Sequence, residues 1–557
     1  MREGIYMLRK RKRIIICLVL PLLFYILFLF TNPLYLSTDS QEVAVVVDGI
    51  YGNNNFCQFL HPLLCVIIKP LNSLFPATDV FTTLLHLAVF FNITLLLYLG
   101  FDGLPAPRQM SLQDYLRIAL VILAIAFISA GVVIWNVNYN IQTAFYVFSG
   151  LLILTVAKMR GKRKIWFVFG AASVTFGYML RIEAALLFIP FIALEFLTEL
   201  VEEKRLPRYL IPSILIILLL FSSRVIFYHI EPYKSAIRYN VARTDCMDFP
   251  MKNWWDIIDP DILQADYLAA TNWGLAETEI MTAELLEKAA KAGGENAFTL
   301  SAGVGPIFAE MWRELTQTNL YMFAMLVMTL ILLLRNMMLC PGLRKLESIL
   351  AVLGGFIILF YFTVRGRAPM RVWEPVMFAT DYVLISAAVR SGTGKRIDLI
   401  FQLILCIVLW FSAGQVMAHN EWRTPMTTLN AKVGAVDRVL TDTFDPDGVY
   451  LWPNWFLNVP WYYRDIGKLP TREALEHHIP VGDWLYGQPY FDEFLESIGL
   501  SNPGRALVES DHVYLMPGGG LYLTFLQAHY GEDLVLEEAG EVNGKTACRV
   551  VHAEDTE

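Results

Sequence analysis

The chain has few charged residues and few cysteines for its length. Charged side chains make up 17% of its 557 residues and hydrophobic side chains 56%, whereas soluble globular proteins average about 25% and about 45–50%. This composition excludes an ordinary soluble enzyme and a disordered protein, and it favours a polytopic membrane protein. Seven cysteines do not suggest a disulfide framework.

Sequence signatures of nucleotide binding are also lacking. The chain contains no G-x-G-x-x-G and no Walker A sequence, so a Rossmann-type site for a nucleotide sugar is not expected. The glycines at 518–520 follow Met516-Pro517 and predict a turn. We find no internal repeat and no low-complexity stretch, and we expect no nucleic acid among the partners.

Apolar stretches of about the length that crosses a bilayer as a helix dominate the chain. Eleven candidates lie near 14–36, 79–99, 117–135, 141–157, 165–180, 184–200, 209–228, 319–339, 347–364, 372–389 and 397–417. The first follows a basic run at 9–13 and lacks a small-residue cleavage site. We therefore expect a retained anchor rather than a signal peptide.

Lysine and arginine residues predict the orientation of these spans. With the N-terminus inside, the basic turns at 158–164, 204–208, 344–345 and 390–396 all fall on the cytoplasmic side. The expected fold is a mainly α polytopic protein of the cell membrane with about 11 transmembrane helices, N-in and C-out. The expected domains are a membrane module (1–228) with a first outer loop (37–78), a large extracytoplasmic loop (229–318), a second membrane module (319–417) and an extracytoplasmic α/β domain (418–557).

The two long polar segments show local structure of their own. The loop pattern predicts a helix within 275–298, and the C-terminal segment alternates strand-like 449–453 and 512–517 with helical 472–478, 490–499 and 521–530. In the first outer loop, the apolar stretch after His61 is too short to span. We expect interfacial helices there.

Several arginines lie on the wrong side for this orientation. They are Arg365, Arg367 and Arg371 at the outer ends of the ninth and tenth spans, Arg181 beside Glu183 in a tight turn, Arg224 near the end of the seventh span, and Arg238 and Arg243 at the start of the large loop. A charge at membrane depth costs roughly 2.5–3.5 kcal/mol. One interpretation is that these arginines pair with Glu183, Glu374 and Asp248. The other is a pocket for a phosphate or pyrophosphate ester, because guanidinium binds phosphate bidentately.

Acidic residues follow the first span in the outer loop. Asp39 and Glu42 lie at the exit of this span, and Asp48 precedes a glycine. A carboxylate at the membrane surface can act as a general base or hold a divalent metal. Alternatively, Asp39 caps the following helix and Asp48 is a turn residue.

Polar residues on the same outer side are candidates for substrate binding. They are His61, Asn138, Glu183 and Asn240. His61 before a proline can equally be structural, and asparagines are common in turns. The aromatic run at 452–463 either stacks on carbohydrate or packs in a core. Cys57 and Cys246 either form a disulfide between the outer loops or remain free.

These features resemble the GT-C superfamily of membrane glycosyltransferases, which includes protein O-mannosyltransferases and lipid A aminoarabinose transferases. The resemblance rests on the early Asp39, the outer first loop and the H-P-L element at 61–63, and it covers about 1–420 in layout. It implies a polyprenyl-phosphate-linked sugar donor and a catalytic role for Asp39. A single Asp in place of adjacent acidic residues, and H-P-L in place of H-P-P-L, leave the base and the metal open.

Shorter motifs resemble a group of bacterial polytopic membrane proteins more closely. They are T-D-S-Q-E-V-A-V-V-V-D-G-I-Y-G, G-Y-M-L-R-I-E, R-Y-N-V-A-R-T-D-C-M-D-F-P and R-G-R-A-P-M-R-V-W-E-P. The resemblance to this group implies no particular activity.

The leading hypothesis is a glycosyltransferase that moves a sugar from a polyprenyl phosphate to a cell-envelope glycan acceptor. Asp39, Glu42 and Asp48 are the candidate catalytic residues. Arg181, Arg243, Arg365, Arg367 and Arg371 are the candidate ligands of the donor phosphate. The rival hypotheses are a transporter or flippase of lipid-linked glycans, and a non-catalytic scaffold of the cell envelope.

Overall fold

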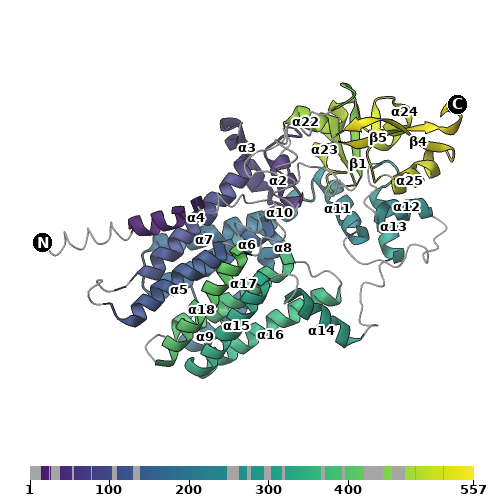
Figure 1. The fold of residues 1–557 in the computed structure, drawn as a ribbon. Coiled ribbons are helices and arrows are strands. Elements are labelled where there is room, and N and C mark those ends of the chain that lie inside the picture. Colours follow the sequence, from purple (N-terminus) through teal and green to yellow (C-terminus); the bar gives the residue numbers. More distant parts are fainter. Residues whose placement is uncertain are drawn as a thin grey trace.

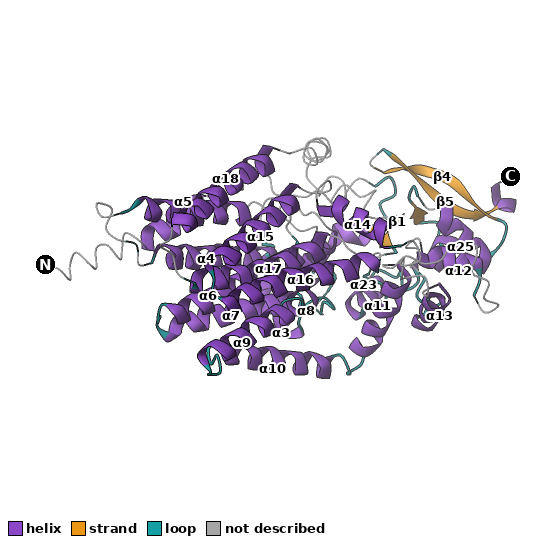
Figure 2. Cartoon of the chain, turned by 90° about the horizontal axis from the view of Figure 1, so that it is seen from below, coloured by secondary structure: helices purple, strands orange, loops and turns teal. Residues whose placement is uncertain are grey.

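A helical bundle and a smaller α/β unit make up the computed structural model (Figure 1). The structure describes residues 14–23, 25–26, 38–52, 56–76, 78–102, 104, 110–129, 138–247, 262–271, 277–293, 303–315, 320–365, 370–391, 396–418, 443–453, 471–482, 484–518, 520–542 and 544–556. The bundle occupies one end of the molecule and the α/β unit the other, as a second view also shows (Figure 2).

The bundle is built from apolar helices of different lengths. They are α4 (Val80–Phe101), α5 (Leu112–Ser129), α6 (Tyr139–Met159), α7 (Lys164–Leu180), α8 (Ile182–Leu186), α9 (Ile189–Glu203), α10 (Ile211–Phe227), α15 (Leu320–Leu339), α16 (Gly342–Val364), α17 (Met370–Arg390) and α18 (Arg396–Ala418). Among the described residues, six helical segments are long and apolar enough to cross a membrane: α4, α6, α8 with α9, α15, α16 and α17. These properties fit a helical, multi-pass membrane protein. A helix lies in every one of the eleven expected ranges, but length and composition identify only these six as possible spans.

Helix α6 forms the centre of the bundle. Nearly all of its side chains are buried, which is typical of a helix that is apolar on every face. It packs closely against α7 because both helices carry glycine at the contact. A Cβ added to Gly150 would lie 2.7 Å from the Gly170 carbonyl oxygen, and one added to Gly177 would lie 3.0 Å from the Thr143 carbonyl oxygen. Small residues allow such close backbone approach in membrane helix pairs.

Polar side chains reinforce this centre. Asn92 in α4 accepts hydrogen bonds from Ser149 in α6 at 3.1 Å and from Ser173 in α7 at 2.7 Å. The Asn92 amide nitrogen donates to the Ala88 carbonyl oxygen at 2.9 Å. The mid-span Asn92 is therefore satisfied by helix–helix hydrogen bonds of the kind that join membrane helices.

The first outer loop holds two short helices with different surroundings. Helix α3 (Pro62–Leu74) exposes Leu63, Val66 and Ile67, as expected for a helix at an apolar interface. Helix α2 (Thr38–Val47) differs from the interfacial helix expected there, because Val43 to Val47 are buried in the core. The first half of α2 is polar, but the run V-A-V-V-V makes its second half apolar on every face, which favours burial of that half.

The C-terminal unit is a five-stranded mixed sheet with flanking helices. The strands are β1 (Val449–Pro453), β2 (His478–Val481), β3 (Val513–Leu515), β4 (Leu534–Val542) and β5 (Lys545–His552), in the order β2-β1-β3-β5-β4. β1 is parallel to β2 and β3, whereas β5 is antiparallel to β3 and β4. The helices are α22 (Arg472–His477), α23 (Pro489–Ser497), α24 (Pro503–Glu509) and α25 (Gly520–Tyr530), followed by the 3-10 turn η8 (Ala553–Thr556).

The large loop and the C-terminal unit are in contact, although they were expected as separate domains. The loop helices are α11 (Tyr233–Met247), α12 (Gln264–Thr271), α13 (Ala283–Gly293) and α14 (Val304–Arg313). Helix α12 lies against α25 (Figure 1), and Asp266 of α12 is 2.6 Å from His529 of α25. Helix α14 instead packs on α16, with Phe308 stacked 5.8 Å from Phe356.

Candidate functional site

Two arginines and one glutamate meet at the ends of α7, α8 and α10. Arg181 lies between α7 and α8, Glu183 lies in the first turn of α8, and Arg224 lies in the last turn of α10. Arg181 Nε is 2.9 Å from Glu183 Oε2, and Arg224 Nη2 is 3.3 Å from Glu183 Oε1. We call these three residues the arginine site; its two cations and one anion give a formal charge of +1.

Aromatic rings cover the two guanidinium groups. The Arg181 guanidinium lies 4.7 Å from the Phe59 ring centre and 5.8 Å from that of Tyr139. The Arg224 guanidinium lies 4.8 Å from the Tyr228 ring centre. These cation–π contacts help to hold the arginines at the bundle surface. Asn138 positions Tyr139, since its side chain caps α6 by accepting from the Asn140 N–H at 2.9 Å.

A buried tyrosine lies beside this site. Tyr178 is 2% exposed, and its hydroxyl has no hydrogen-bond partner among the described residues. Tyr178 lies in the last turn of α7, three residues before Arg181, which places it near the arginine site. A buried hydroxyl without a partner costs roughly 1–3 kcal/mol, so it is a natural contact for a ligand oxygen.

His61 is a structural residue in this geometry. Its Nδ1 accepts from the Leu63 N–H at 3.2 Å and caps α3. Since Nδ1 accepts, Nε2 carries the proton and donates to the Leu220 carbonyl oxygen at 2.9 Å. Burial lowers the pKa of His61. The interpretation of His61 as a structural residue therefore fits its contacts better than that of a ligand.

A second polar group joins three distant parts of the chain. Gln58 of the first outer loop donates to Asn240 of α11 at 3.0 Å, and Gln488 of the C-terminal unit donates to Gln58 at 3.1 Å. Arg243 Nη2 donates to the same Asn240 oxygen at 3.0 Å. Asn240 and Arg243, expected to bind substrate and phosphate, thus lie together. Tyr228 links this group to the arginine site, because its hydroxyl donates to the Gln58 carbonyl oxygen at 3.0 Å.

Asp48 caps the N-terminus of α4. Its carboxylate accepts from the Val80 and Phe81 N–H groups of α4 at 2.9 and 3.2 Å. Asp79 caps the same end, accepting from the Thr82 N–H at 2.8 Å. Burial and the neighbouring Asp79 charge raise the pKa of Asp48 to about 8. These contacts fit the turn interpretation of Asp48 better than a role as base.

The structure describes the side chains of only some of the remaining acidic and basic candidates. Glu42 is buried in α2 with 2% exposure, and Arg365 ends α16. Asp39 lies in α2 and Arg371 in α17, but their side chains lie outside the described part of the chain, as does Arg367. Most of the aromatic run at 452–463 lies outside it as well, namely 454–463, whereas Trp452 is buried in β1.

Cys57 and Cys246 do not form the disulfide that was considered. Both are free and buried. The Cys246 thiol donates to the Leu286 carbonyl oxygen at 2.9 Å, and burial raises the pKa of this thiol to about 12. Within the described residues, no group of three or more His, Cys, Asp and Glu side chains is arranged to hold a metal ion.

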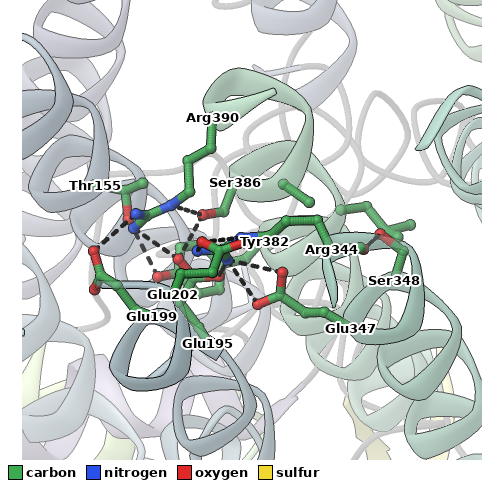
Figure 3. Close-up of polar contacts among 12 residues, drawn as sticks. Thr155, Glu195, Glu199, Glu202, Arg344, Glu347, Ser348, Tyr382, Ser386 and Arg390 are labelled. Carbon is green, nitrogen blue, oxygen red and sulfur yellow. Dashed lines mark hydrogen bonds and ion pairs between the residues drawn. The ribbon is translucent and has the colours of Figure 1, made fainter. Parts of the chain in front are cut away.

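Figure 3 shows a buried charge cluster built around Arg344, in the first turn of α16, and Arg390, at the end of α17. Arg344 Nη1 is 3.2 Å from Glu195 and 2.8 Å from Glu347, while Arg390 lies 2.8 Å from Glu195 and 2.7 Å from Glu199. The side chains of Glu195, Glu199 and Glu347 are fully buried. The cluster ties α9, α16 and α17 together, and Ser386 adds a hydrogen bond to Glu195 at 2.8 Å.

The sequence reasoning missed this cluster. Arg344 and Arg390 were assigned to basic turns, but the Arg344 side chain is 1% exposed. The signal was the spacing of Glu195, Glu199 and Glu202 in α9, at i, i+4 and i+7, which places three acids on one helix face. Acids on one face of an apolar helix require cations from a neighbouring helix.

The sequence matches no protein-family model and no curated protein, and no solved structure matches the chain.

Proposed function

We propose that this protein is a membrane glycosyltransferase of the GT-C type. It would move a sugar from a polyprenyl phosphate to a glycan acceptor of the cell envelope. The observation that carries the proposal is the arginine site, where two guanidinium groups contact one carboxylate. Beside it lies the Tyr178 hydroxyl, for which the described residues supply no hydrogen-bond partner. This arrangement suits a phosphate ester, which needs excess positive charge and hydrogen-bond donors.

The chemistry gives a reason for such a site. A sugar on a polyprenyl phosphate stays at the membrane surface, because its lipid does not leave the bilayer. The phosphate gains charge as the bond to the sugar breaks, so nearby guanidinium groups stabilise the transition state. Arg181 and Arg224 would hold the phosphate, and Tyr178 would donate to one of its oxygens. Asp39 is the proposed general base for the acceptor hydroxyl.

The other candidate residues would have supporting roles in substrate binding or in positioning helices. Arg365, Arg367 and Arg371 would extend the positive surface toward a pyrophosphate or a second anionic group. Asn240 and Arg243 would contact substrate where the loop, the first outer segment and the C-terminal unit meet. Asp48 would position α4 rather than react.

The proposed topology has eleven spans in the cell membrane, with the N-terminus inside. The loop at 229–318 and the C-terminal unit would then both be extracytoplasmic. Their mutual contact through Asp266 and His529 supports placing both segments on the same side of the membrane. The arginine site would lie at the outer leaflet.

The test is sugar transfer by the full-length protein in lipid nanodiscs, using polyprenyl-phosphate-linked sugars and isolated cell-envelope glycan. Asp39→Asn is expected to abolish transfer, and Arg181→Gln to lower the rate on the order of 100-fold, as loss of a transition-state donor does. Arg505→Gln, an exposed arginine of the C-terminal unit, is the control and should keep the rate. Transfer by Asp39→Asn at the wild-type rate would refute the assignment of the base.

Transport of lipid-linked glycans is the second candidate. Buried carboxyl groups in α17, Glu374 and Asp381, favour it, because ionisable residues inside transporter bundles often carry protons. Movement of a labelled lipid-linked glycan between leaflets of proteoliposomes, without any transfer product, would favour this candidate.

A further inference from the structure

Two carboxyl groups are buried where α17 faces α15. Glu374 is 0% exposed and Asp381 is 6% exposed. They are seven residues apart and therefore lie on one helix face, about 10 Å apart along its axis. Asp381 accepts from the Thr329 hydroxyl of α15 at 2.7 Å. Neither oxygen of Glu374 has a hydrogen-bond partner among the described residues.

Among the side chains that the structure describes, no cation forms an ion pair with Glu374 or Asp381. The side chain of Arg371, three residues before Glu374 in α17, lies outside that described part. Tyr321 of α15 is within electrostatic reach of both carboxyl groups. The charged groups on the helices packed against α17 are engaged elsewhere. Arg335 on α15 pairs with Asp398 at 2.7 Å, and Glu183 on α8 pairs with Arg181 and Arg224. The others belong to the buried charge cluster: Glu195, Glu199 and Glu202 on α9, Arg344 and Glu347 on α16, Lys158 on α6, and Arg390 on α17 itself. Arg365 is only partly buried at the end of α16.

An ionised carboxylate at such a position is unfavourable. Moving a charge into a protein interior costs several kcal/mol when no counter-ion accompanies it, and the bilayer adds to this cost. Each group must therefore hold a proton or a cation. Calcium requires six to eight oxygen ligands and magnesium near-octahedral geometry, whereas the described surroundings of Asp381 supply one hydroxyl.

We propose that Glu374 and Asp381 form a proton-binding site between α15 and α17. Both carboxyl groups are protonated while this interface is closed. Any movement that admits water between α15 and α17 favours release of a proton, so proton concentration biases the position of these helices. This inference goes beyond the proposed function: it concerns different residues from the arginine site, and either proposal can fail without the other.

Infrared spectroscopy of the full-length protein in nanodiscs tests the site. A protonated carboxyl group gives a C=O band distinct from that of a carboxylate. The wild-type protein should show this band at neutral pH and lose it at alkaline pH. Glu374→Gln and Asp381→Asn should each lower the intensity of this band. The decrease in the double variant should equal the sum of the decreases in the two single variants.

The matched control is Glu310→Gln, which changes an exposed carboxyl group of α14 and should leave the band unchanged. A neutral-pH band in the double variant equal to that of the wild type would overturn the proposal. If the variants fail to fold, labelling of the wild type decides instead. A hydrophobic carbodiimide should label Glu374 or Asp381 at neutral pH and less at alkaline pH; absence of label from both would also overturn the proposal.

Discussion

At the scale of single residues, Asp48 shows how neighbours determine the role of a carboxyl group. It lies with Asp79 at the N-terminus of α4, where both carboxylates accept backbone N–H groups. The N-terminus of the helix favours the ionised form of Asp48, but burial and the nearby Asp79 carboxylate disfavour this form. The net result is the raised pKa of about 8.

Asp48→Asn should weaken the dependence of stability on pH. The folded pKa of about 8 exceeds the value of about 3.9 for an unfolded chain. Folded Asp48 therefore keeps a proton that the unfolded chain has lost, and stability falls as pH rises from about 4 to about 8. Thermal unfolding in detergent across this range should show a smaller fall for Asp48→Asn. Asp511→Asn, at a side chain that is 88% exposed, should behave as the wild type does; equal slopes for Asp48→Asn and wild type would contradict the prediction.

The sequence predicted some of these residues and not others, for physical reasons. Arg181 and Glu183 are two residues apart, so a tight turn between two apolar helices was enough to predict their contact. Gln58 and Gln488 meet across 430 positions of the chain, and no local pattern indicates such a pair. The arginine and carboxylate candidates were expected to form one site, but the described residues bring only Arg181, Glu183 and Arg224 into direct contact.

At the scale of helices and strands, composition and periodicity predicted most of the elements. The five elements expected in the C-terminal segment correspond to β1, α22, α23, β3 and α25. β2, β4, β5 and α24 were missed. β4 carries exposed acids in L-V-L-E-E-A-G-E-V, which breaks strict alternation, and pairing with β5 supplies the stability that the local pattern lacks.

The glycine contact between α6 and α7 should not tolerate a methyl group. A Cβ at Gly150 would lie 2.7 Å from the Gly170 carbonyl oxygen. Although alanine favours a helix over glycine by about 1 kcal/mol, Gly150→Ala should destabilise the bundle by roughly 1–3 kcal/mol through overpacking. Gly354→Ala in α16, where nothing lies within 4 Å of the added carbon, is the control and should be neutral or stabilising. Thermal unfolding in detergent measures both; a stable Gly150→Ala variant would contradict this contact.

The stability of the bundle should depend on Glu195, the central acid of the buried charge cluster. Glu195→Ala leaves Arg344 and Arg390 buried without their shared carboxylate. Removing one partner of a buried ion pair typically costs about 3–5 kcal/mol. Glu203→Ala changes a glutamate of the same helix that is 46% exposed and should cost much less. Unfolding midpoints that are equal for the two variants would show that the cluster does not stabilise the bundle.

At the scale of the whole molecule, the part of the loop that contains α12 lies against the C-terminal unit, whereas α14 lies on the bundle (Figure 1). Glu277 of the loop is fully buried and accepts from Asn502 at 2.6 Å and Tyr530 at 2.5 Å. Arg505 adds an exposed pair with Glu279 at 2.7 Å. The sequence indicated two polar segments on one side of the membrane, but their contact depends on residues more than 220 positions apart.

Glu277→Ala should loosen this contact. The change leaves the buried Asn502 amide and the half-buried Tyr530 hydroxyl without this acceptor. A buried unsatisfied group costs roughly 1–3 kcal/mol, and the half-buried hydroxyl should cost less because water can reach it. Amide hydrogen exchange in α12 and α13 should become faster than in the wild type. Glu279→Ala removes only the exposed pair and should leave exchange nearly unchanged. Unaltered exchange in Glu277→Ala would mean that the loop holds its position without the C-terminal unit.

The central claim is that the arginine site binds a lipid-linked phosphate, and native mass spectrometry of the full-length protein with a polyprenyl phosphate tests it most directly. The wild type should retain the lipid. The double variant Arg181→Gln/Arg224→Gln should reduce the bound fraction at least 10-fold, equivalent to about 1.4 kcal/mol or more. The control variant Arg505→Gln should bind the lipid as the wild type does. Equal retention of the lipid by the double variant and the wild type would contradict the claim.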